Sequence, residues 1–264
     1  MWPSLGYDFV EDDADPMDDD GHGTHVSGTI GAIGNNGMGV VGVNWRAEIM
    51  GIRFLGPQGG TTEDAISSIE FAVRNGAKIS NNSWGGGGWS QAMYDAIAAA
   101  GREGHLFICA AGNDNMDIEQ TVTSPSSFNL PNMITVAAST RTDERADFSN
   151  WGTSVVHIAA PGHEIMSTTP GGTYSVFSGT SMASPHVAGV AALILAQNPH
   201  LDIQVVRELI LSSAEPVDGW EDFVLTGGRL DAGAALDGRG GVVGFFTFDD
   251  LGQTVEHYTY SRAW

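Results

Sequence analysis

The 264-residue chain carries 32 acidic side chains against 11 lysines and arginines, a net charge of −21 with neutral histidines. This charge disfavours nucleic acid and anionic membranes, so neither is expected as a partner. The length suits one large domain with a single core. The single cysteine, Cys109, excludes an internal disulfide and lies in the apolar run HLFICAAG, which predicts a buried structural thiol.

The chain opens with an acidic, loop-like stretch over residues 1–20 and then alternates between helical and strand patterns. Helices are predicted at 22–33, 61–74, 90–103, 181–197 and about 202–213, and strands at 48–54, 77–83, 105–111, 133–139 and 155–160. Strands that alternate with helices predict a parallel sheet covered on both faces. The sequence therefore indicates an α/β protein.

The two ends of the chain differ from its middle. The opening MWPSLGYDFVEDD has neither the charged start nor the apolar core of a signal peptide, which predicts a cytoplasmic protein or a piece of a longer precursor. No apolar run is long enough to span a bilayer. Residues 240–264 are aromatic, alternating and poor in helix signals. We therefore predict one domain over residues 1–239, followed by a tail that begins a β-rich segment.

Two polar residues stand beside glycines at the ends of predicted elements. His22, in GHGTHVSG, is by itself a metal ligand, a catalytic base or an ordinary polar side chain. Asn113, in AAGND, follows a predicted strand, and sites in open parallel sheets form beyond the carboxyl ends of the strands. Its amide suits donation to an oxyanion, whereas the simpler interpretation is a turn-forming asparagine.

Ser181 opens a predicted helix in SGTSMASPHVAGVAAL. A hydroxyl there lies at the positive end of the helix dipole, although an N-cap role is the simpler interpretation. Small residues recur every four positions on both helices: Gly23, Ser27 and Gly31 on the first, and Ser184, Ala188 and Ala192 on the second. These flat faces predict that the helices pack together and that His22 reaches Ser181, where a histidine acts as a general base.

The motifs together resemble those of the subtilisin-like serine proteases, or subtilases. DDGHGTHVSGTIGA resembles the histidine motif of the family, AAGND its oxyanion asparagine and SGTSMASPHVAG its serine motif, and NNSWGG, RADFSNWG and AAPGHEIMST match as well. The resemblance covers roughly residues 5–237. It implies a three-layer α/β fold with a mainly parallel central sheet. It also implies a serine endopeptidase with Ser181 as nucleophile, His22 as base and Asn113 as oxyanion donor.

The resemblance further implies how a protein or peptide substrate binds. The substrate backbone would be held as an added strand. The residues implied for this role are Gly59, Gly60, Asn82, Ser83, Trp84, Gly85 and Gly112. His25 and His186 match structural positions, and Ser124-Pro125 resembles a cis-proline site. An extracellular, monomeric protein is expected on the same grounds.

One part of the family pattern is not found. The catalytic acid of the family lies in an Asp-Ser/Thr-Gly motif about thirty residues before the histidine, whereas 21 residues precede His22 and none of them forms that motif. The acid orients the imidazole, so activity without it should fall by orders of magnitude. We expect an upstream segment to supply the acid. The alternatives are a relative that only binds peptides, or an acid from another chain.

The acidic loop suggests a metal. Asp8, Glu11, Asp13 and Asp15 crowd eight positions, and calcium accepts such oxygen ligands in irregular geometry. Some subtilases bind calcium in the corresponding loop, whereas a solvated acidic loop is the alternative. GNNGMGVVGV resembles a second calcium loop, with Asn36 as a ligand. An acidic, calcium-dependent structural or adhesive domain would explain the charge but not the three motifs.

Overall fold

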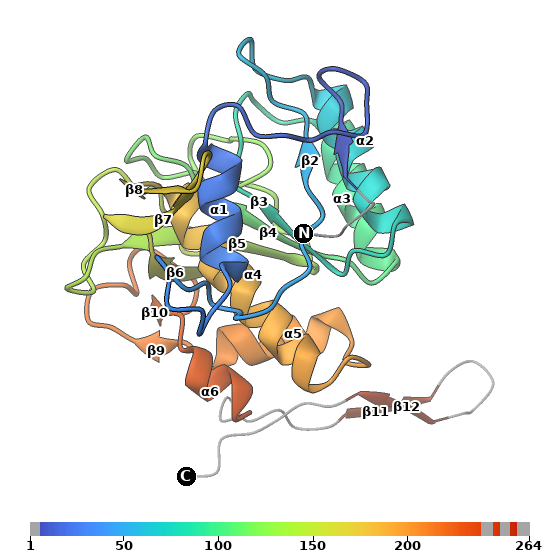
Figure 1. Cartoon of the computed structure of the whole chain (residues 1–264). Helices are drawn as coiled ribbons and strands as arrows, with labels where there is room; N and C mark the ends of the chain where they lie inside the picture. Colours follow the sequence, from blue (N-terminus) through green and yellow to red (C-terminus); the bar gives the residue numbers. More distant parts are fainter. Residues whose placement is uncertain (1–5, 239–244, 249–253, 258–264) are drawn as a thin grey trace.

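The computed structural model describes residues 6–238, 245–248 and 254–257. A six-stranded sheet lies between two layers of helices (Figure 1). In spatial order its strands are β3 (Ile79–Asn82), β4 (Leu106–Ala110), β5 (Met133–Ser139), β6 (Ile158–Pro161), β10 (Gly228–Arg229) and β9 (Glu215–Pro216). The ladders are parallel except for that between β10 and β9. The predicted three-layer α/β architecture is therefore confirmed.

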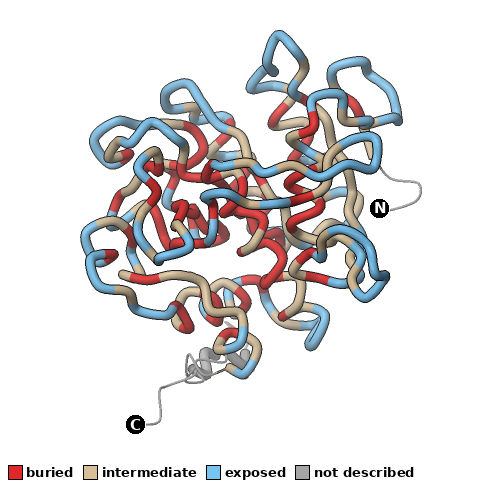
Figure 2. Tube along the Cα trace, turned by 60° about the vertical axis from the view of Figure 1, so that its left-hand side comes forward, coloured by how far each residue is buried: buried red, intermediate tan, exposed pale blue. Residues whose placement is uncertain are grey.

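The alternation of side chains along the central strands explains the two helix layers. In β4, Leu106 and Ile108 face one core, whereas Phe107 and Cys109 face the other. The first core is closed by α4 (Thr180–Gln197), α5 (Ile203–Ser212) and α6 (Ala232–Leu236). The second is closed by α2 (Thr62–Arg74) and α3 (Gln91–Arg102). Figure 2 shows the buried stretches in the middle of the molecule and the exposed ones on its outer loops.

Most predicted elements are found close to their expected bounds. The side chains of Thr61, Ser90 and Asp202 cap α2, α3 and α5 by accepting backbone N–H groups. The Ser124-Pro125 bond is cis, as predicted. Cys109 is buried, and this burial raises the pKa of its thiol to about 12, which fits the structural role predicted for it. None of the described helices combines the length and apolarity that crossing a bilayer requires.

Two parts of the fold differ from the prediction. The strand predicted at 48–54 is reduced to β2 (Ile52–Arg53), which pairs in parallel with β1 (Tyr7–Asp8) in a separate sheet. The sequence also did not predict the antiparallel hairpin of β7 (Ile165–Thr169) and β8 (Thr173–Phe177). Its serines and threonines give a weak strand signal, because only one face of the hairpin is covered, by α1 (His22–Gly31).

The C-terminal tail is described in two short pieces. β11 (Phe245–Phe248) and β12 (Thr254–His257) form an antiparallel pair. The other residues of the predicted β-rich segment lie outside the described part of the chain, so the start of such a segment at residue 240 remains a prediction. The boundary between domain and tail at residue 239 remains a prediction.

Candidate active site

The side chain of Asp18 stabilises the first turn of the helix that carries His22. The Asp18 carboxylate accepts hydrogen bonds from the backbone N–H of Gly21 (2.9 Å) and from the N–H (2.7 Å) and hydroxyl (2.6 Å) of Thr24. Burial acts to raise the pKa of Asp18, but the hydrogen bonds outweigh it and hold that pKa below its usual value. Gly21 has φ 102°, a left-handed conformation that favours glycine. Together they fix His22 as the first residue of α1.

Ser181 lies in the first turn of α4, next to the end of β3. Its hydroxyl donates to the carbonyl oxygen of Ser83 over 3.4 Å, and the hydroxyl of Ser83 donates to the carbonyl oxygen of Ser181 over 2.8 Å. The N–H groups of a first helical turn have no partner within the helix. The Ser181 hydroxyl is therefore held beside backbone donors, at the end of the helix where negative charge is stabilised.

Asn113 is oriented by the residue before the serine. Its Oδ1 accepts hydrogen bonds from the backbone N–H (2.8 Å) and the hydroxyl (3.0 Å) of Thr180, and that hydroxyl accepts one from the N–H of Gly112 (3.0 Å). Because the oxygen is occupied, the Nδ2 amide remains the free end of the side chain. Asn113 thus offers a hydrogen-bond donor next to Ser181.

The three predicted catalytic residues meet in one cavity of about 410 Å³. His22 reaches it from α1, Ser181 from α4 and Asn113 from the loop after β4. The remaining lining residues are Val176, Phe177, Ser178, Gly179 and Met182. Sequence reasoning did not identify the residues from β8 because they carry no motif. Their one signal is their position immediately before Ser181.

The surroundings of His22 favour its neutral form. Burial lowers the pKa of His22, and the nearby carboxylates of Asp20 and Asp18 act in the opposite direction without cancelling it. Among the residues that the structure describes, no carboxylate forms a hydrogen bond with the His22 ring. The imidazole is therefore prepared to accept a proton at neutral pH, but no acid within this part of the chain orients it.

We expect Asp20→Asn to lower the pKa of His22, because removal of the exposed carboxylate removes a charge that stabilises the imidazolium. The measurement is an NMR titration of the His22 ring in both proteins. Asp12→Asn, in the same loop, is the matched control and should leave the titration unchanged. An unchanged or raised pKa in Asp20→Asn would show that Asp20 does not act on His22.

Comparison with known proteins decides the family. Residues 5–243 match the subtilase family. The chain is a subtilase. It is 42% identical over 212 residues to alkaline serine exoprotease A of Vibrio alginolyticus, covering 79% of this chain and 38% of that protein. It is 37% identical over 232 residues to thermitase of Thermoactinomyces vulgaris, covering 88% and 80% of the two chains.

A solved structure supports the fold of this subtilase. The crystal structure of a cold adapted subtilisin-like serine proteinase matches it with a TM-score of 0.74 and 41% identity, over 84% of this chain and 80% of the other. The thermophilic serine proteinase of Bacillus sp. strain AK1 is 40% identical over 215 residues. This subtilase spans 38% of the length of the Vibrio relative and 52% of the length of the Bacillus one.

The residues predicted to bind substrate do not line the cavity of the subtilase. Gly59, Gly60 and Gly85 are exposed, and a Cβ on Gly60 would lie 2.3 Å from the carbonyl oxygen of Phe54, so only glycine fits there. Asn82 is buried and donates to Ser80 and to the carbonyl oxygen of Ile108. The hydroxyl of Ser83 donates to the carbonyl oxygen of Ser181, and the N–H of Gly112 donates to the hydroxyl of Thr180.

Two of these predicted side chains serve the fold. The ring of Trp84 packs edge-on against Phe54 and Phe107, with centroids 5.0 and 6.2 Å away. The side-chain amide of Asn82 donates to residues of β3 and β4, within the sheet.

Among the histidines predicted to be structural, His186 has its ring Nδ1 within 2.9 Å of the carbonyl oxygen of Met182, one turn earlier in α4. Its surroundings agree with that role.

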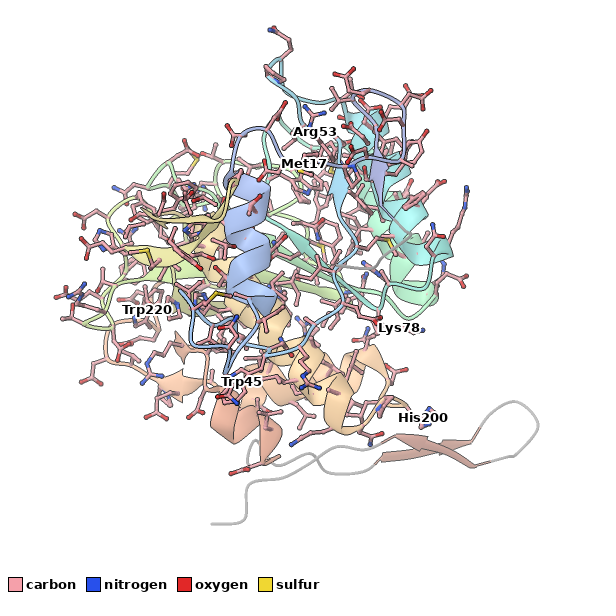
Figure 3. All side chains as sticks on the ribbon, in the orientation of Figure 1. Met17, Trp45, Arg53, Lys78, His200 and Trp220 are labelled. Atoms are coloured by element: carbon pink, nitrogen blue, oxygen red, sulfur yellow. The ribbon has the colours of Figure 1, made fainter. Side chains whose placement is uncertain are left out.

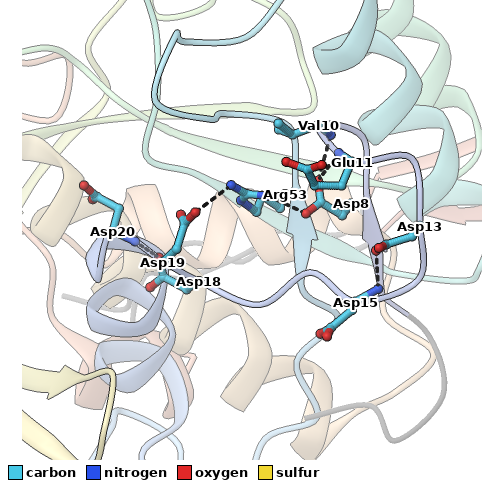
Figure 4. A network of polar contacts seen from close by, with 9 residues as sticks. All are labelled: Asp8, Val10, Glu11, Asp13, Asp15, Asp18, Asp19, Asp20 and Arg53. Atoms are coloured by element: carbon cyan, nitrogen blue, oxygen red, sulfur yellow. Dashed lines mark hydrogen bonds and ion pairs between the residues drawn. The ribbon is translucent and has the colours of Figure 1, made fainter.

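The acidic loop of the subtilase is organised by an arginine (Figure 4). The buried Asp8 carboxylate contacts the Arg53 guanidinium at 2.5 Å and accepts the N–H groups of Val10 (2.7 Å) and Glu11 (3.2 Å). Arg53 also bonds Asp19 at 2.9 Å. Figure 3 shows Arg53 on the side of the molecule where α1 begins. The guanidinium supplies the positive charge that a buried carboxylate needs.

This arrangement does not gather the predicted calcium ligands. Glu11, Asp13 and Asp15 are exposed, and the Asp13 carboxylate accepts the N–H of Asp15 (2.8 Å). Asn36 is exposed and accepts the N–H of Met38 within its own loop (3.0 Å). Over the described ranges, no three His, Cys, Asp or Glu side chains are grouped closely enough to hold a metal ion. The donor chemistry suits calcium, but in this structure the carboxylates do not converge on one point.

We expect Arg53→Gln to destabilise the fold, because it leaves the Asp8 carboxylate buried without its counter-ion. Burial raises the pKa of Asp8, but Arg53 and the backbone donors outweigh it and lower that pKa, so the stabilisation is present at neutral pH and is lost as the pH falls through the lowered value. Urea midpoints of wild type and variant at neutral and acidic pH measure this, and the two should converge in acid.

Arg74→Gln is the matched control for this prediction. Arg74 pairs with Glu70 on the exposed surface of α2 at 2.8 Å, where an ion pair contributes little. Its urea midpoint should stay close to that of the wild type. A loss in Arg53→Gln no greater than the loss in Arg74→Gln would contradict the role given to the Asp8–Arg53 pair.

Proposed function

We propose that this subtilase hydrolyses internal peptide bonds of proteins, as a serine endopeptidase, through an acyl-enzyme on Ser181. The observation that carries the proposal is the meeting of His22, Asn113 and Ser181 in a single cavity. A base, an oxyanion donor and a nucleophile at one point are what acyl transfer requires. The names of the relatives, which include serine proteases and subtilisins, agree with it.

In the proposed reaction, His22 takes the proton of the Ser181 hydroxyl as the oxygen attacks the substrate carbonyl. The negative charge that develops on the carbonyl oxygen is stabilised by the Nδ2 amide of Asn113 and the backbone N–H of Ser181. His22 then gives the proton to the departing amine. A water molecule, activated by the same imidazole, hydrolyses the acyl-enzyme and frees Ser181.

The acid that orients His22 is proposed to come from a segment preceding residue 1. Support comes from two strand edges: in the described part of the chain, β2 pairs only with β1, and β3 pairs only with β4 along its ladder. An unpaired strand edge can accept a further strand. Such a strand is where the family pattern predicts its Asp-Ser/Thr-Gly motif.

The test compares residues 1–264 with the protein extended by its own upstream coding sequence. Both are incubated with casein, and new amino termini are measured. We expect the extended protein to cleave internal bonds and the 264-residue chain to be slower by orders of magnitude. Binding of peptides without cleavage by the extended protein would favour the peptide-binding alternative. Specific activity that rises with protein concentration in the 264-residue chain would favour an acid from another chain.

The substrate is proposed to lie as an extended strand between Gly59–Gly60 and Ser83–Gly85. The exposure of these glycines and the polar end of β3 support this. The N–H and C=O groups of Gly59 already pair with Gly56, so the pairing with a peptide would fall to Gly60 and to Ser83–Gly85. Asn82, Trp84 and Gly112 would support this groove from behind. A Cβ on Gly85 would lie 3.2 Å from the carbonyl oxygen of Ser124, whereas nothing lies within 4 Å of such a Cβ at Gly86, Gly87 or Gly88, so a large substrate side chain has room beside those three glycines.

Calcium binding is a general property of the subtilases, and we propose that the acidic loop binds it through Glu11, Asp13 and Asp15. The exposure of these carboxylates supports the proposal, although they would have to converge on the ion. The test is the melting temperature with calcium and with chelator, in wild type and in the double variant Asp13→Asn, Asp15→Asn. A calcium-dependent rise that persists in the variant would exclude these ligands.

We propose that the peptidase domain covers residues 1–239 and acts outside the cell as a monomer. The family match over residues 5–243 supports the extent of the domain. A relative named cell wall-associated protease, from Bacillus subtilis, supports an extracellular location. The strongly acidic composition favours solubility and self-repulsion, which supports the monomer. Light scattering on the purified protein measures its oligomeric state.

A further inference from the structure

His25 connects α1, which begins with His22, to β8, the strand that precedes Ser181. It lies one turn after His22 and is completely buried. Its ring Nε2 is 3.0 Å from the carbonyl oxygen of Ile165 and 3.1 Å from that of Ser175. Because both partners are acceptors, Nε2 carries the proton and donates to both strands of the β7–β8 hairpin. Figure 1 shows α1 running beside this hairpin.

The same ring also supports a wall of the catalytic cavity. It stacks on the ring of Phe177, with centroids 4.3 Å apart and planes 6° from parallel. Phe177 lines the cavity together with His22 and Ser181 and ends β8, four residues before the serine. A displacement of the His25 ring would therefore move a cavity wall.

The contact between α1 and the hairpin is close along its whole length. The hydroxyl of Ser167 donates to the carbonyl oxygen of His25 (2.7 Å), and that of Thr168 donates to the carbonyl oxygen of Thr24 (2.9 Å). A Cβ on Gly28 would lie 2.1 Å from the Thr168 hydroxyl, so glycine is needed for this approach. The hairpin is thus joined to the helix by backbone as well as ring contacts.

We infer that His25 is a positioning residue for the proposed acyl transfer. It fixes α1, and with it His22, against the β7–β8 hairpin, and it holds Phe177 as a wall of the cavity. Its ring Nδ1 has no hydrogen-bond partner and is buried, so the ring gives its one donor entirely to the hairpin. The inference rests on the proposed function, because the step that it assists is the attack of Ser181.

Two substitutions of His25 distinguish the contribution of its aromatic ring from that of its Nε2 hydrogen-bond donor. His25→Phe keeps an aromatic ring to stack on Phe177 but loses the Nε2 donor, whereas His25→Gln keeps an amide donor. His157→Phe is the matched control, because His157 is equally buried, accepts the N–H of Thr135 (2.9 Å) and does not line the cavity. Each variant is examined by amide hydrogen exchange over residues 165–177 and by the rate at which a fluorophosphonate probe labels Ser181, per folded molecule.

We expect His25→Phe to speed exchange in the hairpin about tenfold and to slow labelling about tenfold, since small misplacements of catalytic groups are costly. His25→Gln should restore most of both. His157→Phe should lower the melting temperature while leaving hairpin exchange and labelling as in the wild type. If His25→Phe and His157→Phe behave alike in both measurements, the inference is wrong.

Two further outcomes are also decisive. Should His25→Phe fail to fold, His25→Leu, which removes both the ring and the Nε2 donor, takes its place, and unchanged hairpin protection and labelling in that variant would overturn the inference. All variants are made in the protein extended by the proposed upstream segment, and if the probe does not label the wild type in that form, the proposed function fails instead. Hairpin exchange then decides whether His25 holds the hairpin.

Discussion

Ser181→Ala is expected to reduce peptide hydrolysis by several orders of magnitude, because no acyl-enzyme can form. Stability should change little, since the Ser181 hydroxyl makes a single long contact of 3.4 Å with Ser83. The expected change in the free energy of unfolding is within about 0.5 kcal/mol. The measurement is the steady-state rate on a peptide substrate, alongside a urea denaturation curve, in the protein extended by the proposed upstream segment.

The matched control for this substitution is Ser184→Ala, one turn further along α4. Its hydroxyl donates to the Asn81 side chain (2.7 Å) and does not line the cavity. It should retain activity per folded molecule. His22→Ala should lose about as much activity as Ser181→Ala, and the double variant should lose no more than either, because the two residues act as a unit. Substantial turnover by Ser181→Ala would exclude this serine as the nucleophile.

Asn113→Asp is expected to lower the rate by about 100-fold to 1000-fold, the range found when a subtilisin loses its oxyanion amide. Aspartate keeps the oxygen that accepts hydrogen bonds from Thr180, so the turn before Ser181 should survive. It replaces the Nδ2 donor with a second, negatively charged oxygen. The loss should therefore appear in kcat, with little change in the melting temperature.

Asn115→Asp separates charge from hydrogen bonding in this prediction. Asn115 is exposed, lies two residues further along the same loop and does not line the cavity, so its substitution adds the same charge without removing the oxyanion donor. We expect a small effect on kcat. If Asn115→Asp loses as much activity as Asn113→Asp, the charge rather than the amide explains the loss, and the role given to Asn113 is wrong.

The catalytic cavity could be predicted because its residues lie at the ends of elements with strong patterns. His22 and Ser181 each open a helix, and Asn113 follows a fully buried strand. The small residues predicted a close approach of the two helices, and α1 does pack against α4. The two glycines of the predicted face have other neighbours: a Cβ on Gly23 would lie beside the Asp18 carboxylate, and a Cβ on Gly31 would lie beside Ala47.

The parts that the sequence could not predict depend on contacts between distant residues. Asp8 was interpreted as a calcium ligand from local spacing, whereas its partner Arg53 lies 45 positions further on. The β7–β8 hairpin is a short, polar element that takes its shape from α1, about 140 residues earlier in the chain. Local pattern carries no information about either partner. The sequence therefore predicted a structural role for His25 but not its contact with Phe177, which lines the cavity.

Identification of the residue modified by a fluorophosphonate probe tests the central claim most directly. The protein, extended by the proposed upstream segment, is treated with the probe, digested and mapped by mass spectrometry. The account predicts one adduct, on Ser181, that is lost in His22→Ala. An adduct on another residue, or none at all in a folded protein, would contradict the proposal that this cavity performs acyl transfer.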